Sequence, residues 1–193
     1  MGSSTMSQRE TAAVREHEAR AAADVIGAEL IWMGFPDAFL FSGRDSRLAF
    51  IDLMRQSRPD VVITHFPGDY HPDHRAVAQI MIDVRVLGKI PHIKTRHSVR
   101  GGISEIFFMD TIAGIDFAPE VYVDVAETFI TKQKMLAKHK SQSAWLKDQY
   151  HTSYQELIKL VAQFRGIQSG HKFAEGFRYL RTWPSRSPID LLP

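Results

Sequence analysis

Apolar residues recur at helical spacing in several segments of this chain and form short continuous or alternating runs in others. The capping box Ser7-x-x-Glu10 predicts the start of a helix that continues to Ile26, with Gly27 as its stop. The β-branched run Val61-Val62-Ile63 predicts a strand covered on both faces. Further helices are expected around residues 48–54, 72–87, 127–136 and 154–164, and further strands at 29–33, 106–109 and 121–125.

The first half of the chain alternates helices with strands, which predicts parallel strands joined by right-handed crossovers. We therefore expect an α/β fold, a Rossmann-like and mostly parallel sheet flanked by helices, in one domain spanning residues 1–193. Residues 89–102 carry glycines and basic side chains and predict an exposed loop or flap. Residues 182–193 contain three prolines and predict an extended arm.

Composition removes several classes of function. The absence of cysteine excludes disulfides, thiolate zinc sites and thiol nucleophiles. No apolar run approaches the roughly 20 residues of a membrane helix and no hydrophobic signal core is present, so we expect a cytoplasmic protein. The net charge of +2 is spread over interspersed acidic and basic residues, which argues against nucleic-acid binding.

Candidate chemistry concentrates in residues 64–74, which hold three histidines and two aspartates between the Val61 strand and the following helix. Strands of open α/β sheets present ligand-handling residues at their carboxyl ends. Pro72 fits the first helical position, where its missing N–H has no partner. His74 lies one turn before Val77, so we expect it on the inward face of the helix.

Two interpretations of this stretch stay open. His71 and His74 with the carboxylate of Asp73 suit zinc, which accepts imidazole nitrogen and carboxylate oxygen. Alternatively, His71 caps the helix, Asp73 favours the dipole of its first turn and His74 is a core histidine. The spacing of two histidines alone does not decide between them.

Other candidates have simpler structural explanations. We expect His139-Lys140-Ser141-Gln142 to be a helix end, because no Gly-x-Ser-x-Gly elbow accompanies Ser141. Asp110 follows an apolar strand and could touch a ligand there. Glu175 lies between two aromatic residues and predicts a structural salt bridge. A nucleotide-binding Rossmann domain is disfavoured because the glycine fingerprint is absent.

Taken together, the motifs resemble the LmbE-like or PIG-L family of zinc-dependent de-N-acetylases, which includes deacetylases of GlcNAc-phosphatidylinositol and of mycothiol and bacillithiol precursors. The resemblance extends over nearly the whole chain, and His71-Pro72-Asp73-His74 is its most specific motif. The other matching pieces, in chain order, are Arg15-x-x-Glu18, Gly34-Phe35-Pro36-Asp37, Arg58-Pro59-Asp60-Val61-Val62, Met109-Asp110-Thr111, His139-x-Ser141-Gln142 and Ala174-Glu175-Gly176-Phe177.

The resemblance implies roles for individual residues. His74 would be a zinc ligand, and His71 would act as general acid or oxyanion stabiliser with Asp73 orienting it. Residues implied to bind substrate are Arg15, Asp69 and Asp110. The implied activity is hydrolysis of an N-acetyl group from an amino-sugar conjugate.

The sequence departs from the family at its beginning. The Ala-His-Pro-Asp-Asp segment that supplies two zinc ligands in the family does not occur in these residues. We therefore expect the first strand or strands to be missing, little or no activity for the chain as written, and self-association into a homo-oligomer through exposed apolar surface. Truncation, a natural remnant acting as a non-catalytic glycan-binding or scaffold protein, and completion of the sheet by a partner chain would each explain the departure.

Overall fold

The computed structural model describes residues 6–99, 101–151 and 153–183. Within these ranges the chain forms two compact units, each considered by itself. We call residues 36–123 with 176–183 the sheet unit, and residues 6–35 with 124–175 the helical unit. The arm expected at residues 182–193 lies almost wholly outside the described residues.

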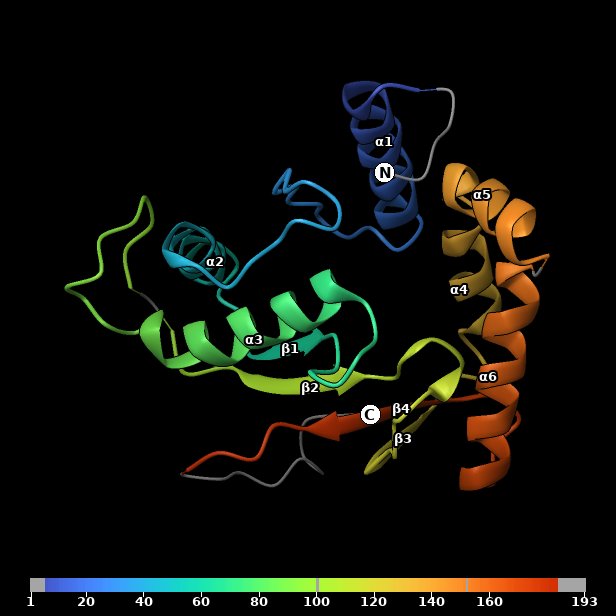
Figure 1. Ribbon diagram of the computed structural model, residues 1–193. Helices are drawn as coiled ribbons and strands as arrows, with labels where there is room; N and C mark the ends of the chain where they lie inside the picture. The colour runs from blue at the N-terminus through green and yellow to red at the C-terminus, as the bar shows by residue number, and fades with distance from the viewer. Residues whose placement is uncertain (1–5, 100, 152, 184–193) are drawn as a thin grey trace. The chain divides into compact units, whose positions relative to one another are not determined.

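A four-stranded sheet in the order β1-β2-β4-β3 is the centre of the sheet unit (Figure 1). β1 pairs with β2 in parallel and β2 pairs with β4 antiparallel, so the sheet is mixed rather than mostly parallel, while the predicted α/β class is confirmed. Thr64, the last residue of β1, lies opposite Phe108. The strands are β1 (Val61–Thr64), β2 (Glu105–Met109), β3 (Val121–Asp124) and β4 (Ala174–Tyr179).

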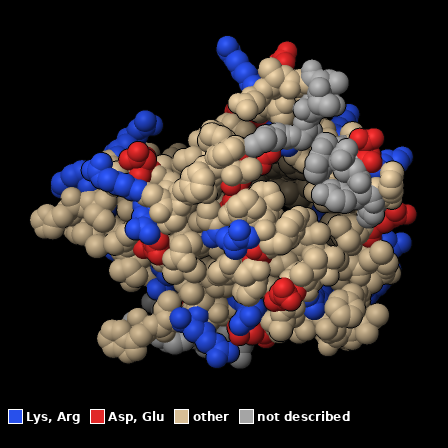
Figure 2. Space-filling model, viewed as in Figure 1, with Lys and Arg blue, Asp and Glu red and all other residues tan. Residues whose placement is uncertain are grey.

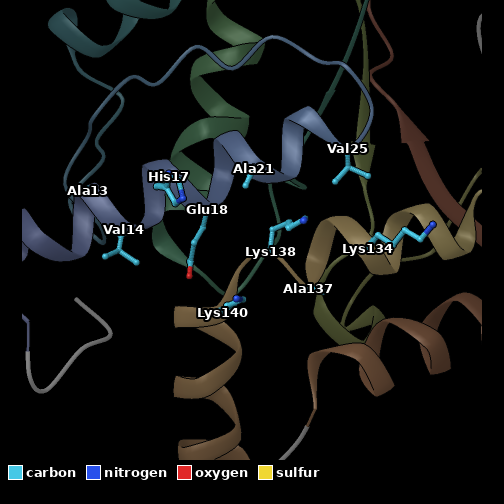
Figure 3. A pocket seen from close by; sticks show the side chains of 10 residues that line it. All are labelled: Ala13, Val14, His17, Glu18, Ala21, Val25, Lys134, Ala137, Lys138 and Lys140. Carbon is cyan, nitrogen blue, oxygen red and sulfur yellow. The ribbon is translucent and has the colours of Figure 1, made fainter.

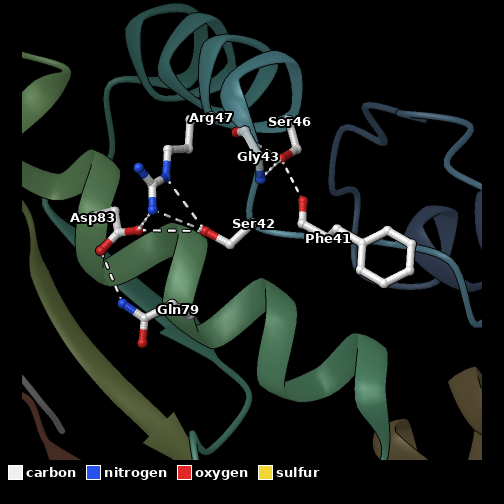
Figure 4. Close-up of polar contacts among 7 residues, drawn as sticks. All are labelled: Phe41, Ser42, Gly43, Ser46, Arg47, Gln79 and Asp83. Atoms are coloured by element: carbon white, nitrogen blue, oxygen red, sulfur yellow. Dashed lines mark hydrogen bonds and ion pairs between the residues drawn. The ribbon is translucent and has the colours of Figure 1, made fainter.

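Two helices and one 3-10 turn complete the sheet unit, and α3 runs along the β1 and β2 strands (Figure 1). Arg47 of α2 forms an ion pair with Asp83 of α3 at 2.7 Å, and Gln79 donates to the same carboxylate at 2.9 Å (Figure 4). These contacts hold α2 against α3. The bounds are α2 (Arg44–Ser57), α3 (Pro72–Leu87) and η1 (Ile112–Gly114).

The core of the sheet unit lies on β2 and β4, where Phe107, Phe177 and Tyr179 are buried together. The buried carboxylate of Glu105 contacts this core at Tyr179. The guanidinium of Arg85 donates to it at 3.3 Å from α3, and the Tyr179 hydroxyl donates to it from β4. Pairing satisfies the charge of Glu105 and fixes α3 on the sheet.

The loop after α3, expected to be exposed or flap-like, is fastened to α2. The buried guanidinium of Arg55 donates to the carbonyl oxygens of Gly88, Ile90 and Ile93 at 2.8–3.0 Å. Asp52 accepts the His97 N–H at 2.7 Å. Burial raises the pKa of Asp52, but the hydrogen bonds from His97 and Thr95 outweigh it and the pKa is lowered.

The helical unit contains four helices. Stacked Phe129 and Phe173 rings, 4.2 Å apart between centroids, form its core with Ala162. Glu175 pairs with Lys132, which confirms the predicted structural salt bridge. The bounds are α1 (Gln8–Asp24), α4 (Phe129–Leu136), α5 (Lys140–Tyr150) and α6 (Tyr154–Ser169).

Two helix boundaries differ from the sequence predictions. His139 is the residue before α5, so the motif expected at a helix end opens a helix instead. α6 continues through Gly166 to Ser169. A Cβ at Gly166 would lie 2.5 Å from the His171 carbonyl oxygen, so this glycine permits a close backbone approach rather than ending the helix.

Two expectations about strands are wrong, the strand at residues 29–33 and the burial of both faces of the Val61 strand. Residues 28–36 contain no strand, because a strand needs a hydrogen-bonding neighbour and none of the four described strands pairs with this segment. β1 exists as predicted but lies at the edge of the described sheet. Its Ile63 side chain is 50% exposed, so the strand is not covered on both faces.

Charged side chains of both signs are interspersed on the face shown in Figure 2. Neither acidic nor basic side chains form a continuous patch on that face, as the interspersed charges of the sequence predict. In the described part of the chain, none of the helices combines the length and apolar character needed to cross a bilayer.

Candidate functional site

The candidate site is the loop between β1 and α3, from His65 to His71. It begins where the buried Thr64 ends β1, at the carboxyl edge of the parallel β1–β2 pair. Three imidazole rings gather here. The His65 and His74 rings stack with centroids 4.1 Å apart, and the His71 and His74 rings lie 4.5 Å apart.

His71 is the N-cap of α3, and Pro72 follows at the first helical position, as predicted. The Asp73 N–H donates to Nδ1 of His71 at 3.3 Å. Because Nδ1 accepts this hydrogen bond, the proton of the neutral ring lies on Nε2. The predicted capping role of His71 is therefore confirmed, and it leaves His71 with an N–H that can donate to a ligand. His74 is not the core histidine of that interpretation, because 27% of its side chain is exposed.

Asp69 is the buried residue of the loop, with only 4% of its surface exposed. Its Oδ1 accepts the His71 N–H at 2.8 Å, and its Oδ2 lies 3.1 Å from Nδ1 of His74. The His74 ring is not aligned for a regular hydrogen bond at this distance, so the contact is mainly electrostatic. A carboxylate at Nδ1 favours the proton on that atom and leaves Nε2 of His74 able to bind a cation.

His65 belongs to the cluster, although the sequence motifs did not single it out. Its buried Nδ1 has no hydrogen-bond partner among the described residues. Burial, and then the neighbouring His74, lower the pKa of His65 to about 4, so the ring is neutral at physiological pH. The sequence signals were its place one residue after a predicted strand and its membership of the histidine-rich residues 64–74.

The Asp73 carboxylate does not contact His71 through a described hydrogen bond. It accepts the Ala38 N–H at 2.6 Å and the Leu40 N–H at 3.1 Å instead. Ala38 has a positive φ of 69°, so Asp73 holds a tight turn beside the first turn of α3. The hydrogen bond that joins Asp73 to His71 is made by the Asp73 backbone N–H rather than by its side chain.

Aromatic packing fixes the middle of the loop. The Phe66 and Phe117 rings pack edge to face with centroids 5.1 Å apart, and the Arg178 guanidinium lies 5.3 Å from the centroid of the Phe66 ring. A Cβ at Gly68 would lie 2.7 Å from the Phe66 ring, so the absent side chain admits the ring. Arg75 donates to the Asp69 and Tyr70 carbonyl oxygens and closes the loop.

The remaining predicted site residues lie in different places. Asp110 directly follows β2, so the parallel register places it at the same carboxyl edge as the histidines. Arg15 lies on α1 in the helical unit, where its Nε is 2.9 Å from the Gln142 amide oxygen once that amide is turned toward it. Glu18, the motif partner of Arg15, accepts the Ser141 N–H and hydroxyl at 2.8 and 2.7 Å. The two family-like motifs thus interlock α1 with α5.

A zinc site requires three or four ligands in one place. Among the described residues, no group of three or more His, Asp or Glu side chains is arranged to hold a metal ion. Asp69 and His71 are already engaged in loop and cap hydrogen bonds, and the His65 and His74 rings stack face to face. The described side chains alone do not fit a closed zinc site.

Comparison with known proteins finds a family model that is similar to the first part of the chain. The model of GlcNAc-PI de-N-acetylase, PIG-L, matches residues 1–85, which include His65 to His74. Diacetylchitobiose deacetylase of Thermococcus kodakarensis is 25% identical over 183 residues, covering 91% of this chain and 66% of the relative. The chain thus spans just under two thirds of that relative.

Solved structures share the fold of this chain. N,N'-diacetylchitobiose deacetylase of Pyrococcus horikoshii aligns with a TM-score of 0.77 and 24% identity, covering 93% of this chain and 68% of that one. A conserved protein of Thermus thermophilus aligns with a TM-score of 0.74 and 24% identity, covering 91% of this chain and 78% of that one. The 4-carboxy-2-hydroxymuconate hydratase of Pseudomonas putida aligns with a TM-score of 0.75 and 16% identity, covering 96% of this chain and 78% of that one. At these identities the likeness concerns the fold.

Proposed function

We propose that the site at the end of β1 serves hydrolytic removal of an N-acetyl group from an amino-sugar conjugate. The PIG-L match and the deacetylase relative support this reaction class. The observation that carries the proposal is the His71–His74 pair held on the buried Asp69 inside the matched residues.

In this proposal the histidines have distinct tasks. The amide hydrolysis adds water across the C–N bond and yields acetate and a free amine. His71 can donate its Nε2 proton to the oxygen of the tetrahedral intermediate or to the leaving amine, because Nδ1 is held by the Asp73 N–H. Asp73 keeps the turn at Ala38 against the site, and Asp69 fixes His71 and His74 relative to each other.

Zinc belongs to the proposal through His74, which would supply one ligand. The other ligands would have to come from outside the described residues or from another chain, since the described side chains do not complete a site. Reduced or absent activity is therefore expected for the chain as written. The residues implied to bind substrate, Arg15, Asp69 and Asp110, keep that role as a proposal.

A non-catalytic glycan-binding protein is the second candidate, favoured by the absence of a three-ligand group in the described residues. Acetate release from N,N'-diacetylchitobiose, with and without added Zn²⁺, distinguishes the two when paired with a binding titration of the same sugar. Zinc-dependent release, even at a low rate, that is lost in His71→Ala and retained in Asp60→Asn establishes the deacetylase. Saturable binding without release supports the glycan-binding role, and neither binding nor release rejects both.

A further inference from the structure

A groove on the helical unit is separate from the histidine site. It has a volume of about 870 Å³ and lies between α1, the end of α4 and the start of α5 (Figure 3). This volume is within the range of small-molecule sites. All of its lining residues belong to the helical unit, so the groove is defined within that unit.

The α1 wall of the groove carries an apolar stripe beside His17 and Glu18. Val14, Ala21 and Val25 follow one stripe along the helix, and Figure 3 shows them on the side that faces the lysines. Val14 and Val25 are eleven positions apart, which corresponds to about 16 Å at the usual helical rise per residue. The stripe is therefore long enough to lie along an extended alkyl chain or a ring system.

The opposite wall is cationic. It carries Lys134, Lys138 and Lys140, and none of the three takes part in an ion pair among the described residues. Glu18 is the one acidic residue of the lining, so the charged side chains sum to two positive charges with His17 neutral. Both Glu18 oxygens accept hydrogen bonds from Ser141, which leaves the lysines without a carboxylate partner in the groove.

We propose that this groove binds an amphiphilic anion, with a phosphate, sulfate or carboxylate head group on an apolar body. The ammonium groups attract the head group, and the apolar stripe removes the body from water. A plain inorganic anion would leave the stripe hydrated, and a neutral apolar molecule would gain nothing from the lysines. The combination of the two walls selects a ligand with both features.

Octyl phosphate, used below its micelle concentration, is the probe, and isothermal titration of the full chain is the measurement. Inorganic phosphate and octyl glucoside test the head group and the chain separately. The expected result is saturable one-to-one binding of octyl phosphate, at least tenfold tighter than either comparison ligand. Absence of binding, or equal affinity for inorganic phosphate or octyl glucoside, overturns the proposal.

Three variants locate the binding. K134E/K138E is expected to weaken octyl phosphate binding at least tenfold, whereas K147E/K159E makes the same charge change on exposed lysines outside the groove and is expected to leave it unchanged. Ala137→Trp fills the groove from an exposed position with the lysines intact and is expected to weaken binding by a similar factor. Equal loss in K147E/K159E, or full affinity in Ala137→Trp, would show nonspecific charge attraction and reject the groove.

Discussion

Asp69 Oδ2 lies 3.1 Å from Nδ1 of His74, and the other carboxylate oxygen of Asp69 accepts a backbone N–H of the same loop. One buried side chain therefore determines both the path of the loop and the electrostatic environment of the histidine. A buried carboxylate with such partners is costly to remove, because its partners lose their acceptor.

We expect Asp69→Ala to lower the free energy of unfolding by about 2–3 kcal/mol, since the His71 N–H is left without its acceptor. Asp69→Asn retains an amide oxygen and should cost less, while removing the charge beside His74. Urea unfolding measures both effects. Asp60→Asn, an exposed carboxylate, is the control, and equal stability of Asp69→Ala and the wild type would contradict the anchoring role.

The contact between Glu18 and Ser141 joins residues 123 positions apart, at the first turn of α5. A double-mutant cycle with Glu18→Ala and Ser141→Ala should give a coupling energy of about 1–2 kcal/mol, because the Ser141 hydroxyl donates a charge-assisted hydrogen bond to the carboxylate. The exposed pair Glu16–Arg20 serves as comparison and should give at most about 0.5 kcal/mol. Coupling no larger than that of the exposed pair would show that the hydrogen bond from the Ser141 hydroxyl to Glu18 does not stabilise the contact between α1 and α5.

Gly166 should resist substitution despite its place in a helix. Alanine normally favours helix by about 1 kcal/mol over glycine. At Gly166 its Cβ would lie 2.5 Å from the His171 carbonyl oxygen, so Gly166→Ala should destabilise by about 2 kcal/mol. Thermal unfolding tests this against Gly102→Ala, where nothing lies within 4 Å and the expected change is within about 0.5 kcal/mol. Stabilisation by Gly166→Ala would refute the close packing.

His65 makes stability depend on pH. Its pKa is about 4 in the folded chain and near the ordinary 6.5 when unfolded, so the unfolded chain binds the proton first. The contribution of His65 to the free energy of unfolding is fully present above pH 6.5. It is lost as the pH falls toward 4, which lowers the free energy of unfolding by roughly 2 kcal/mol after allowance for solvent screening. His65→Phe keeps a ring against His74 without titrating. Urea unfolding at pH 7 and 4.5 should show a smaller acid loss in the variant, and an unchanged loss would exclude His65 as its source.

Local patterns predicted much of the fold correctly. Capping and apolar periodicity located α1, α2 and α3, and the Pro72 start of α3 was predicted to the residue. Residues 29–33 have the composition of a strand but form none, because pairing depends on a neighbour elsewhere in the chain. The same dependence placed β1 at an edge and left Ile63 half exposed.

The sequence by itself determined the α/β class and the placement of His71 and His74 at the start of a helix after a strand, since both follow from interactions within a few residues. The PIG-L motifs could be recognised there as well. Only the tertiary structure decided that Asp73 holds residues 38–40, that Asp69 links the two histidines, and that Glu18 caps α5. These are hydrogen bonds and ion contacts set by folded geometry, and those of Asp73 and Glu18 join residues 33 to 123 positions apart, which no local pattern specifies.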